Sequence, residues 1–289
     1  MEAGMRILDL DRTGLAALRG RDLTAAVAAS EGRTMVAEVF ADRAALSFDG
    51  RTGVHNAELM AAFGADVIVL NMIDRVWDGT TFRFPGLGEL ASLHELAVRI
   101  GRPIGVNLEP GTVPELRKAT RDNAQRLADA GAALIVLTAN PSTDGSLDGM
   151  AKATEQLRTE AALWVGKMHH AGHPEPITAR KLANLVDAGA DGVILPIPGT
   201  LPGVTREAAA SAVAAVHEKG AVVMGAIGTS QEGAHTNVVP QLALTAKEIG
   251  VDAHHIGDCF LPGMGDPELL YAYSVAIRGR RHTWTRMAR

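Results

Sequence analysis

Two short segments of the chain place acidic, basic and imidazole side chains directly after an apolar stretch. One is Asn107-Leu-Glu109, and the other begins at Lys167 and runs Lys-Met-His-His. A carboxylate or an imidazole can move a proton as a general acid or base, and a desolvated lysine can form a Schiff base with a carbonyl substrate. The candidate catalytic residues are therefore Glu109, Lys167, His169, Asn107 and Glu38.

Alternation along a strand leaves open how two of these residues act. If Gly105, Asn107 and Glu109 face one way, Glu109 is a general base, a metal ligand or the partner of Lys167 in a buried ion pair. By the same alternation, Gly166 and Met168 face inward and Lys167 does not. A lysine that pairs with a charge or binds phosphate is then the alternative to a Schiff base.

Glycine-rich turns with hydroxyl side chains follow two later apolar stretches, at residues 196–203 and 225–230. Backbone N–H groups in such turns can bind phosphate, and the hydroxyls can donate further hydrogen bonds. Tight turns without a ligand are the alternative. The candidate phosphate-binding residues are Gly199, Thr200, Gly228, Thr229 and Ser230.

The segment His254-His255-Ile-Gly-Asp258 contains possible ligands for a divalent metal. Adjacent histidines on a strand point to opposite faces, so only one of the pair can serve. The candidate metal set is Glu109, His255 and Asp258, with Mg²⁺ or another divalent ion as the cofactor. No nucleotide cofactor is indicated, and Cys259 is expected to be a packed thiol.

Composition excludes several classes of protein. The chain has 289 residues, a formal net charge of −5 and no basic stripe, which argues against nucleic acid as a partner. It lacks both a signal-peptide pattern and an apolar stretch long enough to span a membrane. With a single cysteine, these features predict a cytoplasmic protein that acts on a small molecule.

The elements that must position these residues are eight short apolar strands separated by helical patterns. The strands are expected at residues 34–40, 66–72, 103–109, 132–138, 162–168, 192–196, 221–227 and 252–257. Thr178 and Thr205 are expected N-caps of two of the helices. Sustained strand–helix alternation predicts a parallel sheet, and here a single (β/α)₈ barrel with its active site at the C-terminal ends of the strands.

A repeated pattern favours a closed barrel over an open sheet. Gly-Ala-Asp or a close variant precedes every second strand, at residues 64–66, 131–133, 189–191 and 250–252. Glycines at 105, 166 and 225 mark strands in between. Interior layers of a barrel are filled alternately by odd and even strands, so a period of two units is expected.

The whole chain, residues 1–289, is interpreted as one domain. Residues 1–32 are expected to form a helical cap over the N-terminal mouth, and residues 33–289 to form the barrel. Two loops, 41–55 and 71–88, are long enough to act as lids. The second contains Asp78-Gly79, which is typical of a hairpin turn.

Five segments, at residues 28–34, 56–66, 101–110, 166–172 and 196–203, resemble a bacterial family of TIM-barrel proteins. Its members are labelled phosphoenolpyruvate-phosphonomutase-like or haloacid-dehalogenase-like, and are often encoded near sugar phosphotransferase transporters. The resemblance implies a barrel that acts on a phosphorylated or carboxylated small molecule. The wider phosphonomutase group binds Mg²⁺ through an Asp-x-Asp-x-Gly-x-Gly loop, whereas this chain has Asn107-Leu-Glu-Pro-Gly111 there. The mutase mechanism is therefore not carried over.

The leading hypothesis is a lyase or isomerase acting next to a carbonyl. Glu109 or His169 would move the proton, and Lys167, Asn107 or Mg²⁺ would stabilise the enolate. The alternatives are a phosphonomutase-like or hydrolytic metal-dependent enzyme and a non-catalytic regulator that binds a sugar phosphate. A homo-oligomer is expected on general grounds.

Overall fold

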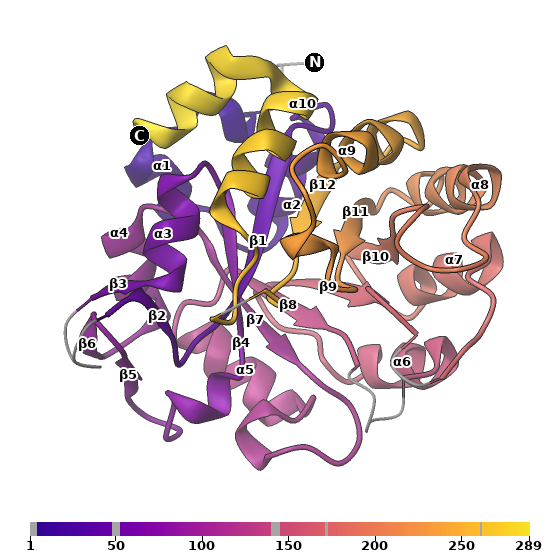
Figure 1. The fold of residues 1–289 in the computed structure, drawn as a ribbon. Helices are drawn as coiled ribbons and strands as arrows, with labels where there is room; N and C mark the ends of the chain where they lie inside the picture. Colours follow the sequence, from indigo (N-terminus) through magenta and orange to yellow (C-terminus); the bar gives the residue numbers. More distant parts are fainter. Residues whose placement is uncertain (1–4, 48–52, 140–144, 171–172, 261) are drawn as a thin grey trace.

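The centre of the molecule is a closed barrel of eight parallel strands (Figure 1). The computed structural model describes residues 5–47, 53–139, 145–170, 173–260 and 262–289. In order around the barrel, the strands are β1 (Thr34–Phe40), β12 (Ala253–Ile256), β11 (Val222–Ile227), β10 (Gly192–Pro196), β9 (Ala162–Gly166), β8 (Leu134–Leu137), β7 (Ile104–Leu108) and β4 (Val67–Asn71). β1 pairs with both β4 and β12, which closes the barrel. The predicted (β/α)₈ barrel and its eight strands are confirmed.

Helices follow the strands and cover the outside of the barrel (Figure 1). They are α3 (Asn56–Ala62), α4 (Leu93–Ile100), α5 (Arg121–Asp129), α6 (Leu147–Thr154), α7 (Ala179–Asp187), α8 (Arg206–His217), α9 (Val239–Glu248) and α10 (Pro267–Met287). Thr178 and Thr205 cap α7 and α8 with their side-chain oxygens, as predicted. In the described parts of the chain, no helix is both long and apolar enough to cross a membrane.

Two helices precede the barrel at the N-terminal ends of its strands. α1 (Arg12–Ala17) and α2 (Gly20–Ala28) follow the 3-10 helix η1 (Ile7–Asp9). Gly20 donates a backbone hydrogen bond to Ala133, directly before β8. Leu23 is buried with Trp164, whose indole N–H reaches the Thr24 hydroxyl at 3.4 Å. This packing fills the end of the barrel opposite the predicted site.

The two long loops carry small hairpins. The first contains β2 (Ala44–Leu46) and β3 (Val54–His55), and its residues 48–52 lie outside the described ranges. The second contains η2 (Ile73–Arg75), β5 (Phe82–Phe84) and β6 (Gly88–Leu90). Asp78 accepts the backbone N–H groups of Thr80 and Thr81 and so forms the predicted turn, which Trp77 and Phe82 close as an antiparallel bridge.

The aspartates of the repeated Gly-Ala-Asp pattern have a shared structural role. Each carboxylate accepts a backbone N–H from the strand that precedes its own along the chain: Asp66 from Met35 (2.7 Å), Asp191 from Leu163 (2.9 Å) and Asp252 from Val223 (2.7 Å). The period of two units therefore reflects carboxylates that satisfy strand N–H groups. The glycines at 105, 166 and 225, in the strands between these repeats, are not equivalent. A Cβ on Gly225 would meet Val251 and Ile197 in the outer core.

Candidate active site

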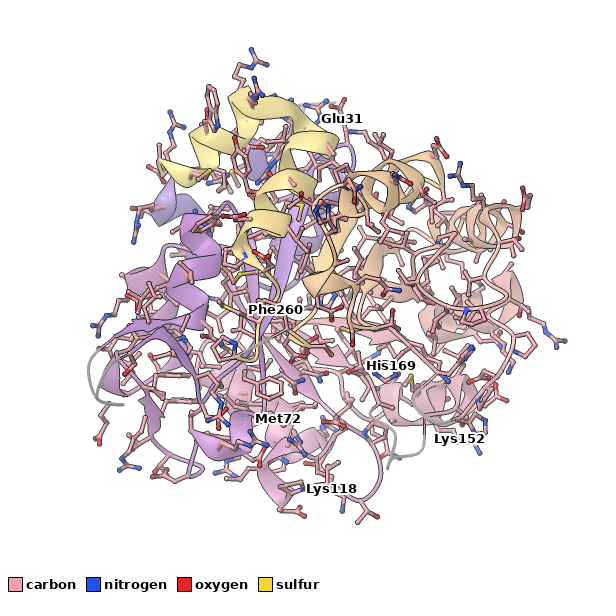
Figure 2. The ribbon with its side chains drawn as sticks, in the orientation of Figure 1. Glu31, Met72, Lys118, Lys152, His169 and Phe260 are labelled. Atoms are coloured by element: carbon pink, nitrogen blue, oxygen red, sulfur yellow. The ribbon has the colours of Figure 1, made fainter. Side chains whose placement is uncertain are left out.

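A small cavity of about 40 Å³ lies at the C-terminal ends of the barrel strands. Figure 2 labels His169 at its edge, after β9. The cavity is lined by Glu38, Asn71, Asn107, Thr138, Ala139, Met168, His169, Gly228, Glu232, Gly257, Asp258 and Cys259. Five of the sequence-predicted site residues meet here: Glu38, Asn107, His169, Gly228 and Asp258. Because β strands of a parallel barrel end at one rim, residues far apart in sequence converge.

Three carboxyl groups face this cavity. Glu38 belongs to β1, Asp258 follows β12, and Glu232 lies in the 3-10 helix η4 (Gln231–Gly233) after β11. Burial, with the negative charges of Glu109 and Glu232, raises the pKa of Glu38 to about 8. Burial and the charge of Glu38 raise the pKa of Asp258 to about 7. The site thus holds carboxyl groups that can exchange protons near neutral pH.

Glu232 is the site residue that the sequence did not indicate. It is fully buried, and burial raises its pKa. A Cβ on Gly257 would lie 2.7 Å from Glu232 Oε1, so glycine at 257 gives this carboxylate its place beside the cavity. The run Gly-Thr-Ser-Gln-Glu-Gly has no strand or helix periodicity, and nothing in it shows which side chain turns inward.

Amide and hydroxyl groups form a chain of hydrogen bonds along the cavity wall. Thr138 donates to Asn107 Oδ1 at 2.8 Å. Asn107 Nδ2 donates to Asn71 Oδ1 at 3.4 Å, and Asn71 Nδ2 donates to Asp258 Oδ2 at 2.9 Å. The chain of hydrogen bonds fixes the orientation of both amides and holds one oxygen of Asp258. These groups are therefore already oriented when a ligand binds.

The two histidines of β12 point to opposite faces, as predicted. His254 faces outward and lies 2.9 Å from the hydroxyl of Tyr273 on α10. His255 faces inward, with Nε2 3.1 Å from Glu38 Oε2. Burial lowers the pKa of His255 to about 4, so at pH 7 it is a neutral hydrogen-bonding partner of Glu38.

Two side chains at the edge of the cavity have shifted pKa values. Burial and the positive charge of Lys167 lower the pKa of His169. Cys259 is an exposed residue, which corrects the expectation of a packed thiol. Partial burial of its sulfur and the charges of Glu232 and Asp258 raise the pKa of Cys259 to about 12. A thiol with this pKa is protonated at neutral pH and is a weak nucleophile.

Glu109 and Lys167 occupy separate ion pairs. Glu109 Oε1 lies 3.2 Å from Arg117 Nε, and Arg117 also pairs with Asp74. Lys167 donates to the carbonyl of His173 at 2.9 Å and to Glu175 Oε1 at 3.2 Å. The Glu109–Lys167 ion pair, one of the alternatives for Glu109, is therefore not formed. Lys167 is held on the outer side of β9 and does not line the cavity, because its neighbour Met168 takes the inward position.

The predicted phosphate-binding residues are only partly brought together. Gly228 lines the cavity, whereas Gly199, Thr200, Thr229 and Ser230 do not. The Thr200 hydroxyl donates to the carbonyl of Ile197 at 2.7 Å, and the Thr229 hydroxyl donates to the carbonyl of Thr200 at 3.1 Å. The first hydroxyl stabilises its own turn, and the second connects the loop after β11 to the loop after β10.

The predicted metal set is not assembled. Within the described residues, no three His, Cys, Asp or Glu side chains converge as ligands of one ion. Glu109 is directed to Arg117, and His255 Nε2 is directed to Glu38. The residues of this cavity therefore do not fit a resident Mg²⁺ held by Glu109, His255 and Asp258.

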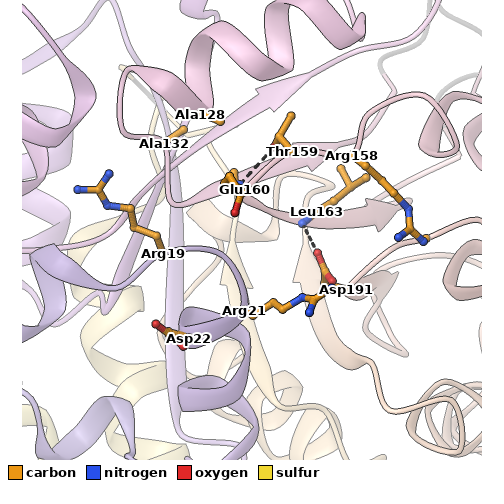
Figure 3. A pocket seen from close by; sticks show the side chains of 12 residues that line it. Arg19, Arg21, Asp22, Ala128, Ala132, Arg158, Thr159, Glu160, Leu163 and Asp191 are labelled. Atoms are coloured by element: carbon orange, nitrogen blue, oxygen red, sulfur yellow. Dashed lines mark hydrogen bonds between the residues drawn. The ribbon is translucent and has the colours of Figure 1, made fainter.

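A larger hollow, about 600 Å³, lies between the N-terminal helices and the start of β9 (Figure 3). Arg19, Arg21, Arg158, Asp22 and Glu160 surround it, over a floor that includes Leu163. Asp191, also in the wall, accepts the backbone N–H of Leu163 with its carboxylate, as a dashed line in Figure 3 marks. Residues at this end of a barrel serve stability, and its charges are balanced, so the small cavity is the better candidate site.

The fold and the cavity define a (β/α)₈-barrel protein with an acid-lined pocket at the C-terminal rim. Residues 8–289 match one family model, and the chain belongs to this family, the domain of unknown function DUF7916. No curated protein sequence matches the chain significantly.

Solved structures with a similar fold include several lyases. An archaeal fructose 1,6-bisphosphate aldolase is 12% identical, with 86% of this chain and 94% of that chain covered and a TM-score of 0.52. A candidate lyase or mutase from Burkholderia cenocepacia J2315 is 17% identical (80% and 78% covered, TM-score 0.49). A 2,3-dimethylmalate lyase of the PEP mutase/isocitrate lyase superfamily is 15% identical (79% and 75% covered, TM-score 0.44). Of these three, the aldolase supports the barrel fold, and at 12% identity it supports the fold alone.

Proposed function

We propose that the protein is a lyase or isomerase that moves a proton at a carbon next to a carbonyl group. The observation that carries this proposal is the pair of buried carboxyl groups, Glu38 and Asp258, whose raised pKa values of about 8 and about 7 bracket neutral pH. Proton transfer is most efficient when the pKa of the catalytic group lies near the working pH. Both groups face the same cavity as the amide of Asn107.

In the proposed reaction, ionised Asp258 removes a proton from the carbon next to the carbonyl. The electron pair of the broken C–H bond forms the C=C bond of an enol, and protonated Glu38 donates a proton toward the carbonyl oxygen. Asn107 is the candidate second donor to that oxygen, and Asn71 positions Asp258 through its 2.9 Å hydrogen bond. Return of the proton at another atom gives isomerisation. In the lyase reaction, the enol returns its O–H proton to Glu38 and re-forms the carbonyl, and a leaving group departs from the β-carbon with its bonding electron pair.

This assignment keeps three residues of the sequence hypothesis and reassigns two. Glu38, Asn107 and His169 stay in the site, with His169 as an alternative base because its pKa is lowered by burial. Glu109 orients the rim through Arg117, and Lys167 has a structural role with Glu175. A small-molecule substrate, a cytoplasmic location and a homo-oligomer stay predictions.

Exchange of carbon-bound hydrogen for deuterium tests the proposal without knowledge of the product. The protein in D₂O would be incubated with pyruvate, dihydroxyacetone, glyceraldehyde and their phosphorylated or amino-substituted relatives, and C–H signals would be followed by NMR. We expect exchange with at least one compound and a loss of about 100-fold or more in Asp258→Asn and Glu38→Gln. The control is Glu218→Gln, an exposed carboxylate at the end of α8.

Full exchange in both site variants would contradict the proposal. Tight binding of a compound with no exchange by the wild-type protein would favour the non-catalytic regulator.

A further inference from the structure

Two buried side chains aim unpartnered oxygens at the cavity. Among the described residues, Glu38 Oε1 and both carboxylate oxygens of Glu232 are buried without a hydrogen bond of good geometry, and the backbone N–H and thiol of Cys259 are the donors that act on Glu232. Glu38 is 3% exposed and Glu232 is 0% exposed. Buried polar atoms in native proteins are nearly always hydrogen-bonded, so each exception needs an explanation. Three orphaned acceptors around one cavity point to a ligand that supplies donors.

The charges around the cavity select against an anion at this position. No lysine or arginine is among its lining residues in the described part of the chain. The nearest guanidinium described above, that of Arg117, already lies between Glu109 and Asp74, and Lys167 is paired with Glu175. A phosphate here would face carboxyl groups with no cation to balance it. The hydroxyls of the predicted phosphate loops are directed to backbone carbonyls instead.

The arrangement of the acceptors favours an N–H donor over a bare metal ion. Metal–oxygen bonds are about 2.0–2.6 Å long, and no three ligands converge that closely among the described side chains. An ammonium group has three donors that reach acceptors about 2.7–3.0 Å away in different directions. The cavity of about 40 Å³ has room for such a small head group.

We propose that the substrate carries a protonated amine, and that this ammonium group is held in the cavity by the carboxylate of Glu232 and by Glu38 Oε1, while Asp258 and the proton of Glu38 serve the proposed proton transfer. This inference rests on the proposed function, because it assigns a substrate class to the same site: small amino-substituted carbonyl compounds. Burial raises the pKa values of Glu232 and Asp258, and a bound cation favours their ionised forms, so binding of the amine should release protons to the solvent.

Paired compounds test the inference on the full-length protein. Thermal shift and calorimetry would compare ethanolamine with ethylene glycol, and glucosamine with glucose, each sugar with and without a 6-phosphate. We expect the amines to raise Tm by about 5 °C at roughly one hundred times Kd, and the alcohols to give no shift. Calorimetry in buffers of different ionisation enthalpy should show proton release at pH 7 that declines toward pH 9.

Glu232→Gln is the decisive variant, because it keeps the size of the side chain and removes only the charge. We expect it to weaken amine binding at least tenfold, whereas Glu218→Gln should bind as the wild type does. If Glu232→Gln does not fold, Glu232→Asp, with a shorter reach, should show the same loss while its far-UV circular dichroism stays native.

Three results would overturn the inference: binding that follows the phosphate and ignores the amine, equal affinity in Glu232→Gln, or Glu232-dependent binding of Mg²⁺ or Mn²⁺ with none of the amines. The two proposals fail separately. Hydrogen exchange on uncharged carbonyl compounds without amine binding would remove the inference and keep the proposed function. Amine binding that depends on Glu232, without any hydrogen exchange, would keep the ammonium site and remove the proposed function.

Discussion

Glu38 illustrates how a single position in a barrel strand can acquire its chemistry from its surroundings. Its side chain points into the barrel, where the imidazole of His255 contacts one oxygen and the other is left without a partner. The carboxyl is more stable protonated there, because the charged form would lose its hydration without gaining a cation. The same burial makes Glu38 an acid at neutral pH and makes the stability of the folded protein depend on the protonation of this residue.

The stability of the protein should therefore fall as the pH rises from 6.5 to 8.5. The pKa of Glu38 is raised from 4.5 to about 8 in the folded protein, so the folded state binds more protons in this range and loses that advantage as the pH passes 8. For this residue the loss is about 2 kcal/mol, or roughly 3 °C in Tm. Thermal unfolding of Glu38→Gln should show a flatter slope, and Glu218→Gln the wild-type slope.

His255 sets the lower end of the pH range in which we expect stability to fall. The lowered pKa of His255, about 4, makes its contribution to stability rise with pH only up to about 6.5, where the unfolded imidazole has lost its proton. An unchanged slope in Glu38→Gln would show that another group titrates.

Most site residues at the rim could be predicted from sequence, for one physical reason. Glu38, Asn107 and Asp258 lie at strand ends, and the period of a strand tells which side chains face inward. Glu232 could not be found in this way, since it lies in a turn whose conformation depends on packing against Gly257. Lys167 obeyed the alternation, which places it outside, although its chemistry suggested a catalytic role.

At the scale of elements, the carboxylates of the repeated pattern connect neighbouring βα units. Asp191 stands directly before β10, and it both accepts the N–H of Leu163 through its side chain and donates its own N–H to the carbonyl of that residue. Sequence spacing showed that the units repeat, but not why. A hydrogen bond from a side chain to a neighbouring strand has no local pattern that could be recognised before the pairing of strands is known.

Asp191→Ala should cost about 1–3 kcal/mol of stability, because the part-buried N–H of Leu163 loses its side-chain acceptor. Urea unfolding would measure this cost as a lower midpoint with an unchanged slope. Since Asp191 lies at the N-terminal end of the barrel, proton exchange activity should be retained in the folded variant. Asp187→Ala, which removes an exposed pair with Lys219, is the control and should cost less than about 1 kcal/mol.

At the scale of the whole molecule, one buried carboxylate joins elements from both halves of the sequence. Asp66 receives Arg278 Nη1 at 2.5 Å and Arg286 Nε at 2.7 Å, both from α10. Arg286 also donates to the carbonyls of Ile7 and Leu10. α10 bends at Gly279, where φ is +72°, and both arginines thereby reach the same carboxylate.

Asp66→Asn should destabilise the protein by about 3–5 kcal/mol, because two buried guanidinium groups would lose the counter-charge that they share. Glu248→Gln removes a charge from an exposed pair with Arg206 and should cost less than about 1 kcal/mol. Denaturant unfolding followed by circular dichroism compares the two. Equal midpoints for both variants would show that the buried cluster adds no net stability.

Closure of the barrel has a consequence for how the chain is made. β1 can complete its pairing only with β12, and Thr34 and its partner Ala253 are 253 − 34 = 219 residues apart. At translation rates of about 5–20 residues per second, the ribosome needs roughly 10–40 s to produce the second strand after the first. During that time one edge of β1 stays open to other chains, so we expect the nascent polypeptide to depend on chaperones more than the finished barrel does.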